Sequence, residues 1–338
     1  MQFSTKIEIP RPEFFISHED HIMMLGSCFA ENIGTMLLKS KFDVNLNPFG
    51  ILYNPVSVSQ AMNKILRKEF FTEKDIFEYR GLYHSFFHHG CFSDVSKEKC
   101  LEKINASMQS AIEDLQEVKF LFVTFGTSYV YELKESSEVV GNCHKLPASL
   151  FTRYRLTVES IVNDWTALLN QLTEYNSNLQ VILTVSPIRH LKDGAHENQL
   201  SKSVLLLAID ELCKQFDNIH YFPSYEIVLD ELRDYRFYAE DMVHPNSTAI
   251  KYLWEKFSNI YFSDDSKQII NEWNKIDAAI NHRPINPNSE EYKHFLNQTI
   301  LKLDTFNAKY PYICCNTEHK ELDRRLEDLN EIFNTRNS

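Results

Sequence analysis

Glycine is scarce in this chain, and long apolar runs are absent. Only 8 glycines and 11 prolines occur among 338 residues, which leaves no low-complexity linker. No window approaches the roughly 18 consecutive apolar residues that indicate a membrane-spanning helix. Residues 1–15 carry scattered charges without an apolar centre, so we expect no secretory signal. These absences favour a chain that folds around one large core, or around a core with an appended unit.

Basic charge and paired cysteines are also lacking. The 35 basic and 47 acidic residues give a formal net charge of −12, which argues against nucleic acid as the main partner and against a basic membrane-binding surface. The 7 cysteines are odd in number and include no C-x-x-C spacing, which indicates reduced thiols. The histidine-rich stretch His84, His88, His89 and Cys91 also lacks a metal-ligand spacing. We therefore expect a cytoplasmic protein without a metal or cofactor.

Buried-strand patterns alternate with amphipathic helices as far as residue 262. The pattern predicts strands over 22–25, 43–49, 120–125, 181–185 and 219–222, and helices from about 30 and over 57–66, 96–116, 158–175, 198–216 and 248–262. Of two further segments, 70–94 has no clean period and is predicted as a loop or a hairpin insertion, and 129–140 resembles a hairpin. The continuous apolar run over 120–125 is typical of a central parallel strand buried on both faces. This alternation predicts an α/β sandwich around a mainly parallel sheet.

The pattern changes after residue 263. Three amphipathic helices are predicted over 269–280, 292–306 and 322–333, with no strand between them. We therefore expect an α/β domain over 1–263 and an α-helical extension over 264–338. The extension packs most easily onto its own domain, but it could also form the face of a homodimer or bind another partner.

The first candidate for chemistry is Ser27, in the stretch Gly26-Ser27-Cys28-Phe29-Ala30. It lies where a predicted strand turns into a helix, so the first helical N–H groups surround whatever its hydroxyl attacks. Gly26 has no Cβ, which suits a crowded turn. The alternative is an ordinary turn with a helix cap. Cys28 could be the nucleophile instead, although we expect its side chain to turn into the core as a small hydrophobe.

The second candidate is the pair Asp241 and His244, just before the last predicted helix of the α/β domain. A histidine takes the proton of a serine hydroxyl when an acceptor holds its other nitrogen. A carboxylate three residues earlier can supply that acceptor if the turn is helix-like. The alternative is a helix-capping aspartate beside a surface histidine.

With these two motifs the chain resembles the GSCFA family, a branch of the SGNH (GDSL-type) hydrolases. Further similar stretches are Asn47-Pro48-Phe49-Gly50, Phe125-Gly126-Thr127, Asn142-Cys143-His144-Lys145, 184–190 and 231–238. The resemblance covers residues 22 to about 262, and the helical extension is outside it. It implies a three-layer, flavodoxin-like fold with a five-stranded, mainly parallel sheet. It also implies acyl-ester chemistry with Ser27 as nucleophile and Asp241 and His244 completing a catalytic triad.

The resemblance also implies an oxyanion hole, the set of N–H donors that stabilises the tetrahedral intermediate. Its backbone donors would be Ser27 and Gly50, and its third donor an asparagine after the third strand. The usual Gly-x-Asn-Asp block reads Gly126-Thr127-Ser128-Tyr129 here, so that asparagine is missing. Either the Ser128 hydroxyl or the Asn142 amide could replace it. We favour Asn142, because an amide N–H is a fixed donor whereas a hydroxyl must rotate.

Four further residues are candidates for substrate binding. Arg189 and His190 follow the predicted strand 181–185, and α/β folds place ligands at the carboxyl ends of strands. His144 could line the acyl or alcohol pocket, or could serve in packing. Ser128 is the fourth candidate.

Together these residues predict a serine esterase or acyl-transferring enzyme. Its substrate would be a small-molecule or glycan O-acyl ester, or a lipid-like one, and the sequence leaves hydrolysis and transfer both open. The rival is a non-catalytic module that binds a glycan or an acylated ligand on the same fold. The missing asparagine favours the rival, whereas the intact serine, aspartate and histidine favour the enzyme.

Overall fold

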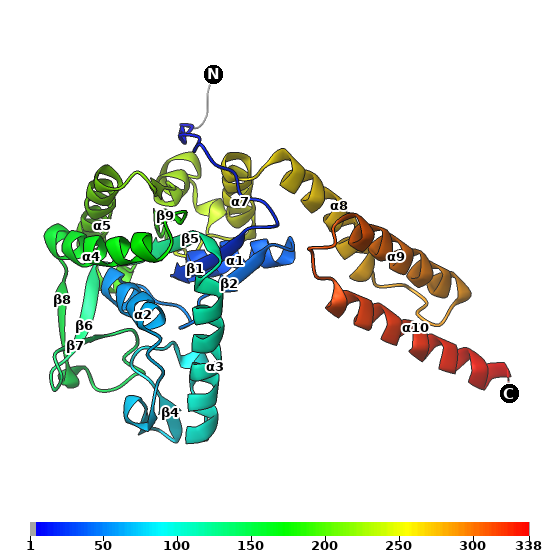
Figure 1. The fold of residues 1–338 in the computed structure, drawn as a ribbon, viewed down its shortest axis with the longest axis horizontal. Helices are drawn as coiled ribbons and strands as arrows, with labels where there is room; N and C mark the ends of the chain where they lie inside the picture. Colours follow the sequence, from blue (N-terminus) through cyan, green and yellow to red (C-terminus); the bar gives the residue numbers. More distant parts are fainter. Residues whose placement is uncertain (1–4, 338) are drawn as a thin grey trace. The chain divides into compact units, whose positions relative to one another are not determined.

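Five strands form the central sheet, in the order β10-β9-β5-β1-β2 (Figure 1). This computed structural model describes residues 5–337; residues 1–4 and 338, which belong to the two expected domains, lie outside the described residues. The strands are β1 (His21–Gly26), β2 (Asp43–Leu46), β5 (Val118–Phe125), β9 (Gln180–Val185) and β10 (Ile219–Tyr221). β1 pairs with β5, β5 with β9, and β9 with β10, all in parallel. Counted along the chain the order is 2-1-3-4-5, which is flavodoxin-like.

Helices cover both faces of this sheet, as the alternation predicted. They are α1 (Cys28–Lys39), α2 (Pro55–Arg67), α3 (Lys97–Leu115), α4 (Val158–Tyr175), α5 (Ala195–Gln215) and α7 (Ser247–Tyr261). On one face, Leu121 and Val123 of β5 join a buried apolar cluster with α2, α3, α4 and α5. On the other face, Phe122 packs against Phe257 of α7, with ring centroids 5.2 Å apart. The predicted three-layer α/β fold is confirmed.

Two small antiparallel sheets account for the insertions. The segment 70–94 contains the hairpin β3 (Phe77–Tyr79) and β4 (Leu82–His84). The predicted hairpin is β6 (Tyr129–Leu133) with β7 (Glu138–Val140), and a third strand, β8 (Phe151–Arg155), pairs with β6. β8 was not predicted, because only Phe151 of its five residues is buried and no apolar alternation marks the strand.

The helices α8 (Asp264–Ile280), α9 (Glu290–Lys309) and α10 (Asn316–Asn337) form a second compact unit together with residues 15–19, 37–43 and 262–263. Within this unit, the indole Nε1 of Trp273 donates to the Lys39 carbonyl at 2.8 Å, and Lys41 Nζ lies 2.6 Å from Glu318 Oε1. The three predicted helices are confirmed, whereas the expected boundary at 263/264 stays a prediction. No helix within residues 5–337 combines the length and apolarity needed to cross a bilayer.

Candidate active site

Ser27 lies between β1 and α1, where a close approach of two strands requires the glycine before it. Gly26 has a φ of +135°, and a Cβ at this position would lie 2.3 Å from the Thr124 carbonyl oxygen of β5. The crowded turn expected from the sequence is therefore confirmed. Ser27 is only 2% exposed, and its Oγ accepts the backbone N–H of Phe29 at 3.3 Å. In this arrangement the hydroxyl caps the first turn of α1.

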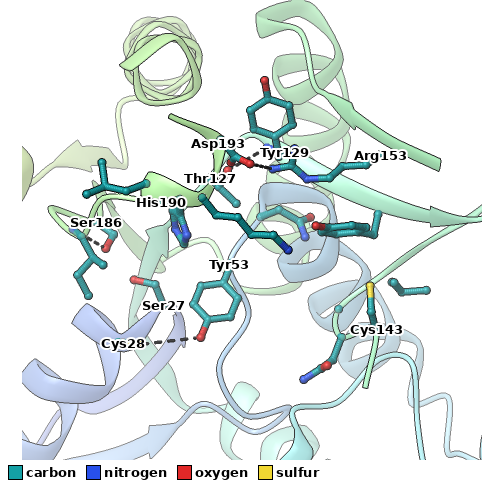
Figure 2. Close-up of a pocket in the computed structure, with 18 of the residues that line it drawn as sticks. Ser27, Cys28, Tyr53, Thr127, Tyr129, Cys143, Arg153, Ser186, His190 and Asp193 are labelled. Carbon is teal, nitrogen blue, oxygen red and sulfur yellow. Dashed lines mark hydrogen bonds and ion pairs between the residues drawn. The ribbon is translucent and has the colours of Figure 1, made fainter. Parts of the chain in front are cut away.

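A cavity of about 670 Å³ adjoins Ser27 at the carboxyl ends of the strands (Figure 2). β1 and β5 are neighbours at the point where the strand order reverses, and this is where α/β folds of this order bind ligands. The side chains around the cavity come from the segments after β1, β5 and β9, from the β6-β7-β8 sheet, and from the loop before α7. Ser27 and His244 both line it.

Asp241 fixes the imidazole of His244. Its Oδ2 lies 2.5 Å from His244 Nδ1, and its Oδ1 accepts the backbone N–H groups of Val243 and His244, each at 2.9 Å. These backbone hydrogen bonds, and then the imidazole, lower the pKa of Asp241 to about 2, so the carboxylate is anionic at neutral pH. Among the described residues, His244 Nε2 has no hydrogen-bond partner, and no hydrogen bond joins Ser27 to His244.

The two backbone N–H groups expected in the oxyanion hole are already engaged. Ser27 N–H donates to the Thr124 carbonyl at 3.3 Å, and Gly50 N–H donates to the Asn47 carbonyl at 2.6 Å. Gly50 does not line the cavity; it has a φ of +71°, and a Cβ there would lie 2.4 Å from the Cβ of His89. This glycine therefore serves a tight turn, and the structure does not bring it to Ser27.

Cys28 is placed differently from the expectation. It is half-buried and lines the cavity, with its Sγ 3.9 Å from the hydroxyl of Tyr53, instead of turning into the core (Figure 2). Its backbone N–H, in the first turn of α1, has no partner among the described residues. This donor was not predicted, although the first N–H groups of any helix are unpaired within the helix.

The structure separates the two candidates for the third donor. Asn142 lines the cavity, and its Oδ1 accepts the backbone N–H of His144 at 2.8 Å, which orients the amide. Ser128 is fully buried, does not line the cavity, and donates its hydroxyl to Ser201 Oγ at 3.0 Å. Of the two, only Asn142 is within reach of a bound ligand, and Ser128 is not brought to the substrate-binding region either.

Of the other candidates for substrate binding, Arg189 and His190 line the cavity and His144 does not. Burial is the main cause, and the charge of Lys202 the next, of a lowered pKa of about 4 for His190, so its ring is neutral at pH 7. His144 Nε2 lies 2.7 Å from the Ser85 carbonyl oxygen, and burial lowers its pKa to about 4. Its position fits the packing alternative. In the described part of the chain, no three His, Cys, Asp or Glu side chains are grouped as metal ligands.

Lys202 contacts Ser186, a residue of the cavity lining, and was not among the predicted site residues. The residue is fully buried, and its Nζ donates to the carbonyl oxygens of Gly126 at 2.6 Å and Ser186 at 2.7 Å, just after β5 and β9. Burial lowers its pKa to about 7. A signal was present, because Lys202 falls on the apolar face of α5 at helical spacing from Leu205 and Ile209.

Comparison with known proteins agrees with the resemblance read from the motifs. The GSCFA family model matches residues 21–257, and a second model, the C-terminal domain of GSCFA domain proteins, matches residues 273–328, within the helical extension that the motifs did not cover. No curated protein matches the sequence. One similar solved structure is a carbohydrate esterase family 3 from Talaromyces cellulolyticus, with 9% identity and a TM-score of 0.33 over 75% of this chain and 99% of that one. So weak a likeness carries no argument. The family model covers most of the chain, which belongs to the GSCFA family.

Proposed function

We propose that this protein is a serine esterase or acyl-transferring enzyme that acts on an O-acyl ester. The observation that carries the proposal is that Ser27 lines the same cavity as His244, whose Nδ1 is held by the Asp241 carboxylate. A nucleophile, a base and an orienting acid are the three groups that acyl transfer through serine requires. The largely apolar and aromatic lining supports an acyl or glycan ester as the ligand; it includes Tyr53, Tyr129, Tyr131 and Phe151.

The proposed reaction has two halves. Ser27 Oγ attacks the ester carbonyl while His244 Nε2 takes the hydroxyl proton, and Asp241 stabilises the imidazolium that forms. The oxyanion accepts hydrogen bonds from Asn142 Nδ2 and from the Cys28 N–H. His244 then gives its proton to the leaving alkoxide, and the acyl group stays on Ser27. Water or an alcohol next attacks the acyl-enzyme, giving hydrolysis or transfer.

The rival function, ligand binding without turnover, also has an observation in its favour. Ser27 Oγ accepts a helical N–H, and no hydrogen bond links Ser27 to His244 within the described residues. For the reaction, Ser27 must rotate out of its capping position toward Nε2. Catalytic hydrogen bonds are often long or unformed before substrate binds, so this geometry is compatible with both functions.

The deciding experiment is labelling with a fluorophosphonate, together with turnover of nitrophenyl esters from acetyl to octanoyl. We expect the wild-type protein to be labelled and active, and Ser27→Ala to lose both properties while it stays folded. Cys28→Ala is the matched control, since it removes the neighbouring cavity-lining nucleophile, and it should keep labelling and activity. Absence of labelling and of turnover in the wild type would favour the binding module. Activity in Ser27→Ala but not in Cys28→Ala would move the nucleophile to the thiol.

A further inference from the structure

We propose that the ligand of this cavity carries a negative charge, which Lys145 and Lys192 recognise. For an ester substrate the inference rests on the proposed function, but the recognition of charge does not. Although the chain as a whole has a net charge of −12, the described residues that line the cavity include Lys145, Arg153, Arg189 and Lys192 and a single carboxylate, Asp193. The charge of the lining is therefore opposite to that of the protein.

The acidic groups around the cavity are already occupied. Asp193 Oδ1 binds Arg153 Nη2 at 2.7 Å (Figure 2), Asp241 binds His244, and Glu197 accepts the hydroxyl of Tyr129 at 2.6 Å. Neither Lys145 nor Lys192 forms an ion pair or a side-chain hydrogen bond within the described part of the chain. Two positive charges at the cavity are thus not paired with a carboxylate among residues 5–337.

Lys145 is presented by a loop whose conformation is fixed. His144 and Lys145 are consecutive non-glycine residues with φ values of +47° and +59°, which is unfavourable for L-residues. The loop is held by Asn142 Oδ1 on the His144 N–H, by the Leu146 N–H on the Cys143 carbonyl at 2.9 Å, and by the His144 ring on Ser85. Strain of this kind persists only where the surroundings impose it, and it concentrates at functional positions.

Lys192 is carried by a different segment, whose backbone is also held in place. It is the middle residue of a short turn (Leu191–Asp193), and Asp193 ties that turn to Arg153 of β8. The Arg153 guanidinium in turn stacks on the Tyr129 ring, 4.0 Å from its centroid. The charge of Lys192 also counteracts the rise that burial causes in the pKa of Cys143, two residues before Lys145. Two separate segments thus bring their ammonium groups to one cavity.

Arg189 contributes less to this selectivity. It also lines a neighbouring hollow that contains Asp230 and Asp234, so its charge is shared between the two sites. A lysine ammonium binds a carboxylate, a sulfate or a phosphate as a point charge. The inferred ligand is therefore an anionic ester, whose charge lies either on the acyl chain or on the alcohol.

Two substrate pairs test the inference and locate the charge. The acyl pair is nitrophenyl glutarate against nitrophenyl hexanoate, and the alcohol pair is para-acetoxybenzoate against para-acetoxybenzamide. We expect kcat/KM for the anion to exceed that for the neutral ester by about ten-fold in one pair at low salt, as two exposed charge contacts allow. The ratio should fall with salt and approach one in the double variant Lys145→Gln/Lys192→Gln. Lys251→Gln, an exposed lysine of α7, is the matched control and should leave the ratio unchanged.

A preference for the neutral ester in both pairs, or an anion preference that the double variant retains, would overturn the inference. Binding of fluorescent probes distinguishes failure of the charge inference from failure of the proposed function, because binding needs no turnover. Anilinonaphthalenesulfonate should bind about ten-fold more weakly to the double variant, whereas neutral N-phenylnaphthylamine should bind equally to both proteins. Equal loss or no loss for the two probes would overturn the charge recognition even if esters are hydrolysed. If the two probes differ as expected but the protein hydrolyses no ester, the charge recognition is supported and the proposed function fails.

Discussion

Asp241 accepts three hydrogen bonds from one short turn, and its proposed role makes a sharp prediction. Asp241→Asn keeps the size of the side chain but can present an N–H to His244, which leaves the imidazole in the wrong tautomer to accept the Ser27 proton. It also removes the anion that stabilises the imidazolium. We expect kcat on an activated ester to fall by roughly 10²–10⁴. The pKa of Asp241 is lowered to about 2, so its carboxylate stays charged above about pH 4, and the loss should persist from pH 7 to 9.

The kcat of this variant is measured across that pH range on nitrophenyl acetate, with Asp241→Glu as a variant that keeps the charge. Rates near wild type for Asp241→Asn would mean that Asp241 only caps the turn and that the site is a Ser27–His244 dyad.

Asn142 allows a second prediction at the scale of one residue. If its amide stabilises the oxyanion, Asn142→Ala lowers kcat by roughly 10²–10³ with little change in KM. Ser128→Ala is the matched control, because the Ser128 hydroxyl bonds to Ser201 away from the cavity and its loss should affect stability more than rate. Steady-state kinetics on both variants decides, and the reverse pattern would assign the donor to Ser128.

The sequence predicted which residues meet at the cavity better than it predicted their backbone contacts. Ser27, His244 and Asn142, which line the cavity, belong to short motifs, and the carboxyl ends of neighbouring parallel strands and the loops beside them share one edge of the sheet. The sequence could not predict that the Gly50 N–H is engaged in a turn, because its hydrogen bond to the Asn47 carbonyl depends on local dihedral angles. Lys202 was missed because a lysine on a helix is ordinarily exposed.

At the scale of elements, the junction of β1 with β5 makes the clearest prediction. Gly26→Ala would place a Cβ 2.3 Å from the Thr124 carbonyl oxygen, so the two strands must separate. We expect a loss of unfolding free energy on the order of 3 kcal/mol or more, with a displaced Ser27 and reduced turnover. Gly81→Ala is the comparison for a positive φ without a clash, because its φ is +77° and, its chain neighbours aside, no atom of the described residues lies within 4 Å of the added Cβ.

We expect Gly81→Ala to lower the free energy of unfolding by only about 1–2 kcal/mol. Urea denaturation of the two variants measures the difference, and equal losses would contradict a steric requirement at Gly26.

Elements were predicted well where periodicity and end signals agree. The helix predicted over 158–175 coincides with α4, whose start is fixed by a Thr157 side chain that accepts the Ser160 N–H and whose face carries Ile161, Trp165 and Leu168. β8 lacks such a pattern, because it forms through pairing with β6 and buries one side chain. Strand pairing of this kind depends on a partner that the local sequence does not specify.

At the scale of the whole molecule, the second unit draws on both ends of the chain. A protein that ends at residue 263 would lose the partners of Lys39 and Lys41, namely Trp273 and Glu318, and the apolar cluster of α8, α9 and α10. We therefore expect this shortened chain to have a lower melting temperature than the full chain and to aggregate on heating. Trp273→Ala in the full chain should lower the free energy of unfolding by about 3–5 kcal/mol, which indicates how much this one side chain contributes.

Melting curves of the full and shortened chains test this expectation. An unchanged melting temperature would show that residues 1–263 fold without the extension, as the predicted domain boundary requires. The sequence could predict three helices here from periodicity alone, but it could not predict that residues 15–19 and 37–43 join them, because such contacts cross most of the chain.

The discontinuity of the second unit has a consequence for biosynthesis. The Trp273 indole and the Lys39 carbonyl are 234 residues apart in the chain, and Lys41 and Glu318 are 277 apart. At roughly 5–20 residues per second, a ribosome takes on the order of tens of seconds to synthesise the intervening chain. The early segments must wait for that time with their apolar groups uncovered, so the nascent protein is a predicted client for chaperones. Protease protection of residues 37–43 in chains stalled at residue 262 would contradict this order of folding.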